Sequence, residues 1–181
     1  VSGIEALLRW HDPVAGIIAP DEFIPIAEET DLIQPIGAWV LHAALRQNRL
    51  WQESGRPLLP VSINLSPRQF RHKDLVADIR AALAETGQPA RLLELEVTEA
   101  ALSHDGEAAR DRLEELAALG VRLAIDDFGT GYSNLVALKR YPVCLCLVVD
   151  HNRNRRAVAC CDRIVFKIER LARCLALHWI E

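Results

Sequence analysis

The sequence lacks an excess of positive charge. It contains 21 Lys and Arg residues against 25 Asp and Glu residues, which gives a formal net charge of −4. Proteins that bind nucleic acid by neutralising phosphates concentrate positive charge on one face. We therefore expect no DNA partner.

Long hydrophobic runs are also lacking. The longest strongly apolar stretch is "PVCLCLVV" at 142–149, far short of the roughly 20 residues that cross a bilayer. No signal-peptide pattern opens the chain. The sequence predicts no membrane segment and a cytoplasmic location.

Cysteines are few and do not form a framework. There are five, all in the last quarter of the chain, at positions 144, 146, 160, 161 and 174. An odd number with two adjacent members does not indicate disulfides, and the spacing fits no common zinc finger. We interpret them as reduced thiols.

The remaining pattern alternates strands with helices. A length of 181 residues suits one domain, spanning residues 1–181. Apolar periodicity and turn residues predict strands at 3–10, 59–66, 91–97 and 121–126, and helices at 20–33, 35–53, 72–87, 105–120 and 162–177. This order favours βα units around a parallel sheet. Both ends of the chain are abrupt, so we expect a fragment.

Polar residues stand out as the last ones of each predicted strand. These are Glu5, Asn64, Glu96 and the adjacent pair Asp126 and Asp127, and the last three strands place them 32 and 30 residues apart, about one βα unit each. Parallel strands deliver their carboxyl ends to one rim, where ligands bind. The side chains are therefore expected to converge.

Convergent carboxylates repel one another unless they take up protons or bind a cation. Oxygen ligands without His or Cys favour Mg²⁺ or Mn²⁺ over Zn²⁺. Two adjacent aspartates can serve two ions, as in two-metal phosphoester hydrolysis. Taken singly, however, Asp126–Asp127 also fits a solvated loop start and Asn64 an Asx-turn. Arg9 fits a helix-type ion pair with Glu5, a surface charge or a phosphate clamp.

Five ordered motifs resemble the EAL domain family of bacterial cyclic di-GMP phosphodiesterases. They are "EALLRW", "DEFIPIAEETDLI", "SINLSPRQF", "ELEVTE" and "IDDFGTGYSNLVALKRYPV", and together they lie within residues 3–143. The resemblance implies an α/β TIM (β/α)8-barrel of EAL type and hydrolysis of cyclic di-GMP to linear pGpG with two Mg²⁺ or Mn²⁺ ions. It also implies sensory or GGDEF-type domains in a full-length protein and a possible homodimer.

The resemblance further implies roles for single residues. Glu5, Asn64, Glu96 and Asp126 match ligands of the first metal, and Asp127 matches a ligand of the second, with Asp126 between them. Glu99 resembles a glutamate that steadies the loop gating the second metal. Leu8 and Arg9 resemble substrate contacts, Arg9 to a phosphate.

The chain departs from the family pattern after Val143. Leu147, or Val148 if one residue is inserted, stands where the family has a lysine that helps hold the attacking water, and the stretch from Cys144 to Asp162 diverges. The first strand and the last βα units of the barrel are expected to be missing. These departures keep open a catalytically inactive EAL domain that acts as a cyclic di-GMP receptor or protein-interaction module, or a metal-binding barrel fragment without a nucleotide role.

Overall fold

The protein is described by a computed structural model that covers residues 3–98, 101–102, 106–126 and 163–169, with the backbone alone given for residue 126 and for 163–169. The strands are β1 (Gly3–Asp12), β2 (Gly16–Ile18), β3 (Val61–Leu65), β4 (Leu93–Thr98), β5 (Arg122–Asp126) and β6 (Arg163–Glu169). The helices are α1 (Pro20–Glu29), α2 (Ile33–Glu53), α3 (Pro67–Phe70), α4 (Leu75–Thr86), the 3-10 turn η1 (Ala90–Leu92) and α6 (Gly106–Ala118).

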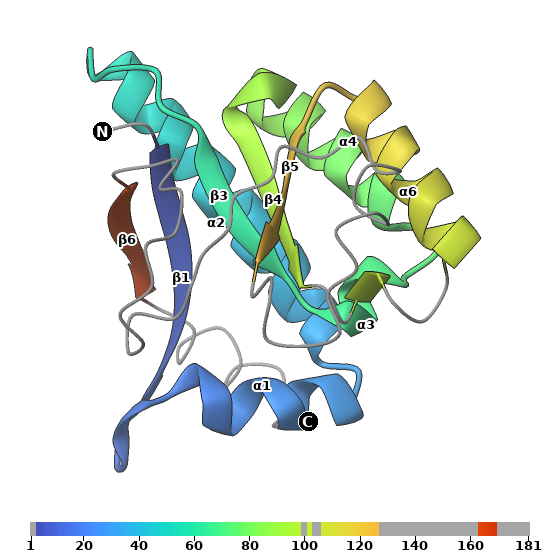
Figure 1. Cartoon of the computed structure of the whole chain (residues 1–181). Coiled ribbons are helices and arrows are strands. Elements are labelled where there is room, and N and C mark those ends of the chain that lie inside the picture. The colour runs from blue at the N-terminus through green and yellow to red at the C-terminus, as the bar shows by residue number, and fades with distance from the viewer. Residues whose placement is uncertain (1–2, 99–100, 103–105, 127–162, 170–181) are drawn as a thin grey trace, which may run out of the picture.

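The strands form one twisted sheet, shown in Figure 1. β1, β3, β4 and β5 are neighbours in that order and run parallel. β2 folds back antiparallel on the far end of β1, while β6 pairs in parallel with the first part of β1. The order β3, β4, β5 with intervening helices confirms the predicted βα units.

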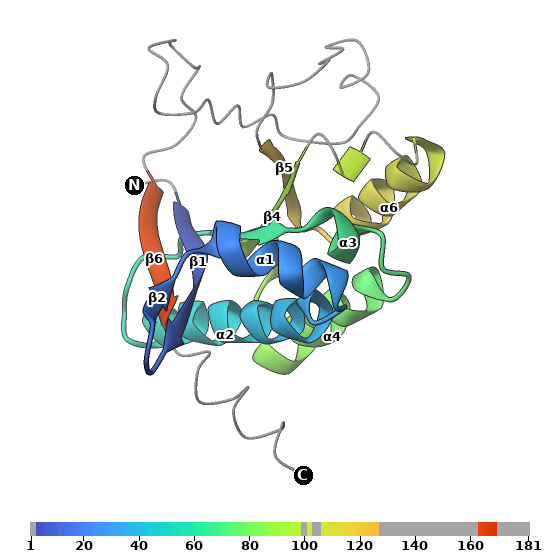
Figure 2. The same cartoon turned by 90° about the horizontal axis from the view of Figure 1, so that it is seen from below.

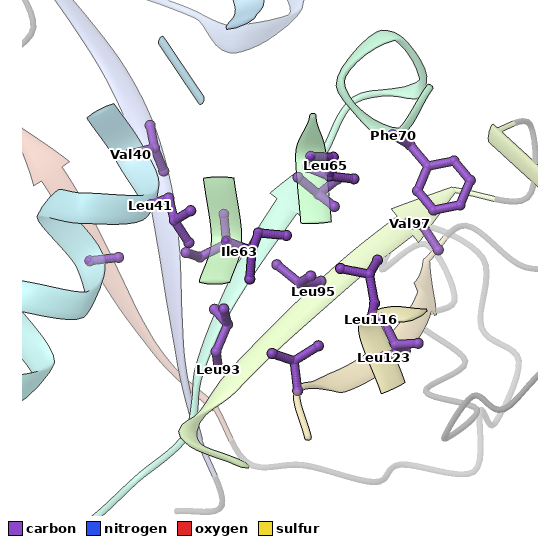
Figure 3. Packing of buried hydrophobic residues seen from close by; sticks show 14 of the residues in the cluster. Val40, Leu41, Ile63, Leu65, Phe70, Leu93, Leu95, Val97, Leu116 and Leu123 are labelled. Carbon is purple, nitrogen blue, oxygen red and sulfur yellow. The ribbon is translucent and has the colours of Figure 1, made fainter. Parts of the chain in front are cut away.

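The helices α2, α4 and α6 lie along one face of this sheet (Figures 1 and 2). α2 contacts β1 and β3, α6 contacts β5, and α4 lies between α2 and α6. The core fills this layer, as Figure 3 shows for Leu41 of α2, Ile63 of β3 and Leu95 of β4. Burial of such apolar side chains is the main favourable term for the fold.

The helices predicted at 20–33, 35–53, 72–87 and 105–120 are found as α1, α2, α4 and α6, but α1 ends four residues before its predicted end and α4 begins three residues after its predicted start. α4 ends where the sequence indicated, because Gly87 adopts the left-handed conformation with φ of 63° at the cap. No helix among the described residues is long and apolar enough to cross a membrane.

The prediction of a helix at 162–177 is wrong for its first part. Residues 163–169 form β6, paired with β1 from Gly3↔Arg163 to Arg9↔Glu169. The edge of β1 offers unpaired backbone groups, and a parallel strand satisfies them. Residues 170–177 lie outside the described ranges, as do all five cysteines.

Candidate metal and nucleotide site

The polar candidates lie on the sheet face opposite the helix layer. Glu5 pairs in register with Ser62, and Asn64 pairs with Glu96. Since side chains alternate along a strand, Glu5, Asn64 and Glu96 share one face of three adjacent parallel strands. Their neighbours along the same strands face the core. The predicted convergence therefore holds for these three residues.

Glu5 and Asn64 are directly bonded. Asn64 Nδ2 donates a hydrogen bond to Glu5 Oε1 at 3.0 Å. Because the amide nitrogen is used in this way, the carbonyl Oδ1 of Asn64 is the atom that can coordinate a cation. The contact thus orients a neutral oxygen ligand beside a carboxylate.

Glu5 is predicted as the last polar residue of the strand at 3–10, and it does not lie at the carboxyl end of the observed strand. Glu5 is the third residue of β1, and the strand continues to Asp12. Its register partner Ser62 lies two residues before Asn64, so Asn64 reaches Glu5 diagonally.

A second polar contact lies next to Glu5 and Asn64. Ser62 Oγ donates to Glu94 Oε1 at 2.9 Å, and both residues are buried, at 2% and 8% exposure. Glu96, on the same strand as Glu94, is 4% exposed. Sequence reasoning missed Ser62 and Glu94, although the alternation of "VSINL" and "LELEV" puts them on the same face as Asn64 and Glu96.

Asp126 is the last residue of β5, and its backbone pairs with Thr98 of β4. That register places it one step further along the shared face than Glu96. The hydroxyl of Thr98 is buried and has no hydrogen-bond partner within the described residues. A buried polar atom of this kind suits a site that receives a polar ligand. Asp127 and Glu99 lie outside the described residues.

Arg9 and Leu8 lie further along β1. Four residues along a strand separate Arg9 from Glu5 by about 13 Å, so the ion pair expected on a helix is wrong. Arg9 Nη1 instead donates to the carbonyl of Leu8 at 2.7 Å. Leu8 is partly buried against the core.

A cavity of about 450 Å³ opens beside these residues. Leu8, Arg9 and Asn64 form part of its wall, and Asp21 and Ile24 of α1 line another part. The walls are mostly apolar, and charged and amide groups from both strands and helices, among them Glu28 and Gln34, interrupt them. Such lining is typical of a site for a small organic ligand with polar substituents.

The described donors fit a hard divalent cation, because they are two carboxylates and one amide oxygen on one sheet face. Among the described side chains, no three of His, Cys, Asp or Glu gather in a group that could hold a metal. Asn64 is not one of these four residue types, and Asp127 and the side chain of Asp126 lie outside the described part of the chain. Mg²⁺ and Mn²⁺ remain the cations that the donor chemistry favours.

Comparison with known proteins identifies relatives over most of the chain. The model of the EAL domain family matches residues 1–152. The bifunctional diguanylate cyclase/cyclic di-GMP phosphodiesterase MucR of Pseudomonas aeruginosa is 50% identical over 141 residues, which are 77% of this chain and 20% of MucR. The cyclic di-GMP phosphodiesterase NbdA of the same organism is 43% identical over 143 residues, 79% of this chain and 18% of NbdA.

A solved structure has the same fold. The PaMucR phosphodiesterase in complex with cyclic di-GMP superposes with a TM-score of 0.74 at 46% identity, covering 77% of this chain and 57% of that one. The predicted TIM-barrel type is thereby confirmed, and the chain represents part of the domain. It spans about a fifth of the length of the curated relatives MucR and NbdA.

Proposed function

Because the chain belongs to the EAL domain family, we propose that it is a cyclic di-GMP phosphodiesterase module that hydrolyses its substrate to linear pGpG. Relatives named cyclic di-GMP phosphodiesterases support the substrate and the reaction class. The observation that carries the proposal is the shared face of Glu5, Asn64 and Glu96, with Asn64 bonded to Glu5. This face offers oxygen donors where a phosphodiester can meet divalent cations.

In this proposal, Glu5, Asn64, Glu96 and Asp126 hold one Mg²⁺ or Mn²⁺ ion, and Asp127 serves a second. When bound, the two ions supply Lewis-acid charge that lowers the pKa of water and stabilises the phosphoryl oxygens. Water attacks phosphorus, the P–O3′ bond breaks, and the 3′ oxygen leaves as a hydroxyl group. Glu99 steadies the segment beside the second ion.

The cavity supplies the nucleotide contacts. Arg9 places a guanidinium in its wall, suited to one substrate phosphate, and Leu8 adds apolar surface. Asp21 lines the same cavity and can accept hydrogen bonds from the N1–H and N2–H groups of guanine. These groups together suit one half of a guanine dinucleotide.

The setting of the module is proposed on the same basis. Residues 1–181 act as one EAL domain, which works in the cytoplasm as part of a longer protein with sensory or GGDEF-type domains. The name of MucR, which combines two cyclic di-GMP activities, supports such an arrangement. A homodimer is a further expectation of the family likeness.

The test is incubation of the protein with cyclic di-GMP and Mn²⁺ or Mg²⁺, with pGpG measured by chromatography. We expect pGpG from the unchanged chain, and at least a 100-fold lower rate from Asp126→Asn, because a first-ion ligand is lost. Calcium should inhibit, since its longer and looser coordination misplaces the attacking water. Full turnover with calcium would contradict this mechanism.

A receptor function is the second candidate, favoured by Leu147 at the position expected to carry a lysine. Leu147 lies outside the described residues. In this case, cyclic di-GMP binds without product and without a need for metal. Calorimetry in the presence and absence of EDTA, alongside the pGpG assay, distinguishes the receptor from the enzyme.

A further inference from the structure

The helix α3 begins three residues after Asn64 and turns the chain away from the site. Ser66 is its N-cap, and Gln69 N donates to Ser66 Oγ at 3.3 Å. In return, Ser66 N donates to the side-chain Oε1 of Gln69 at 3.1 Å. This reciprocal capping box fixes the backbone immediately after Asn64 and Leu65.

The side chain of Gln69 packs against α2 at Gly37. Gln69 is 8% exposed, and a Cβ atom added to Gly37 would lie 1.6 Å from its Nε2 and 2.8 Å from its Cδ. A glycine inside a helix costs about 1 kcal/mol relative to alanine. Gly37 is therefore explained by the space that the Gln69 amide occupies.

Other contacts tie the rest of α3 to its surroundings. Gln34 Nε2 donates to the carbonyl of Arg68 at 3.3 Å, and Arg68 pairs with Asp31 at 2.6 Å. From α6, Arg112 Nη1 donates to the carbonyl of Phe70 at 2.5 Å, with its guanidinium 5.7 Å from the centre of the Phe70 ring. Of the α3 residues, Gln69 is the one whose side chain accepts a hydrogen bond from Ser66, two residues after Asn64.

We propose that Gln69 is a positioning residue for Asn64, acting through Ser66 and supported by Gly37. The bond to Glu5 sets the rotation of the Asn64 amide, whereas Gln69 sets the backbone from which that amide extends. A metal ligand has to be held within about 0.5 Å of its productive place. The inference rests on the proposed function, in which Asn64 is a ligand.

The test measures Mn²⁺ affinity of the whole chain by isothermal calorimetry, together with the melting temperature. Gln69→Leu keeps most of the volume but loses the acceptor for Ser66 N–H, and we expect its Mn²⁺ Kd to rise about 10-fold. Gln69→Glu keeps the acceptor of a capping box, so its Kd should stay within about 2-fold of the unchanged protein. Arg110→Ala, which removes an exposed ion pair with Glu114 on α6, is the matched control and should change neither quantity.

A second pair of variants covers the case in which Gln69→Leu does not fold. Gly37→Ala forces the Gln69 amide out of its place and should also weaken Mn²⁺ binding about 10-fold. In the double variant Gly37→Ala/Gln69→Ala the overlap is gone, so the melting temperature should recover. Mn²⁺ binding should stay weak there, because the cap on Ser66 is still missing.

A purely structural role for Gln69 predicts a different result. In that case Gln69→Leu and Gly37→Ala lower the melting temperature and leave the Mn²⁺ Kd within about 2-fold of the unchanged protein, which overturns the proposal. Asn64→Ala is the reference for loss of the ligand itself. If the unchanged chain binds no Mn²⁺, or if Asn64→Ala binds it equally well, the proposed metal site is wrong and the role of Gln69 falls with it.

Discussion

A buried polar side chain on a sheet face lowers the stability of the fold unless it has a hydrogen-bond partner or a bound ligand. In this protein Asn64 bonds to Glu5, and Ser62 bonds to Glu94 in the register row that also contains Glu5. Ser62 and Glu94 are both buried, so the hydrogen bond of this buried pair is shielded from water. We infer that the buried pair supports the carboxylate and the amide that would meet a cation.

This support can be tested with Ser62→Ala. The change removes a hydrogen-bond donor to a buried carboxylate, and we expect the free energy of unfolding to fall by about 1–3 kcal/mol. The control is Ser54→Ala, because the Ser54 hydroxyl bonds to the carbonyl of Trp51 at an exposed helix end. Urea unfolding followed by circular dichroism measures both. An equal loss in the two variants would argue against a special role for the buried pair.

For single residues, the sequence predicted the position of those whose side chains are typical metal ligands. Asn64 and Glu96 were predicted to share a rim, and their register pairing confirms it. Ser62 and Glu94 were not predicted, because their importance comes from burial, which depends on what covers the strand. The close contact of Gly37 with Gln69 was equally hidden, since it joins elements 32 residues apart.

Among the secondary-structure elements, the connection between α1 and α2 combines an unusual backbone conformation with an ion pair, both at Asp31. Asp31 has a φ of 62°, which non-glycine residues seldom adopt, yet its carboxylate pairs with Arg68 of α3. The hydrogen bond from Arg68 holds the pKa of Asp31 below its usual value, with its charge adding to the effect. The pair therefore couples the turn to α3.

A pH dependence follows from this lowered pKa. Because the folded-state pKa of Asp31 lies below its unfolded value near 4, the stabilisation is present above pH 4 and is lost as pH falls through the folded-state pKa. Arg68→Gln should return the carboxyl pKa towards its usual value and move acid unfolding to higher pH. Nuclear magnetic resonance titration of the Asp31 carboxyl measures the first effect. Arg49→Gln, which breaks an exposed pair within α2, should leave that titration unchanged.

The error over residues 162–177 also belongs to the element scale. Ile164 and Ile168 are four residues apart, which places them on one face of a helix and equally on one face of a strand. Phe166 lies between them and extends the same alternation. Short apolar segments fit both periods, and the available edge of β1 decides in favour of the strand.

Across the part of the molecule that the structure describes, α2, α4 and α6 cover one face of the sheet (Figure 2), and Glu5, Asn64 and Glu96 lie on the other. The sequence predicted the order of strands and helices well, because βα units repeat at a regular spacing. It could not predict the pairing of β1 with β6, which joins residues about 160 positions apart. Local periodicity carries no information about such a contact.

The layered arrangement predicts very different costs for the same substitution on α2. Leu45 is fully buried and Leu50 is 58% exposed. Leu45→Ala should lower the free energy of unfolding by about 2–5 kcal/mol, whereas Leu50→Ala should change it by less than about 0.5 kcal/mol. Chemical denaturation of the two variants compares them directly. Similar losses would mean that α2 does not pack on the sheet as described.

The strand β4 carries apolar side chains towards the helices and Glu94 and Glu96 towards the opposite face, and its first five residues are buried. Deleting a single residue from the short connection that precedes β4 would shift its register by one. The apolar and the acidic side chains would then change faces, and both carboxylates would enter the hydrophobic core. Deletion of one residue before Leu93 should therefore destabilise the protein more than most amino-acid replacements within the strand. Loop-length variation among relatives should accordingly be scarce at this junction.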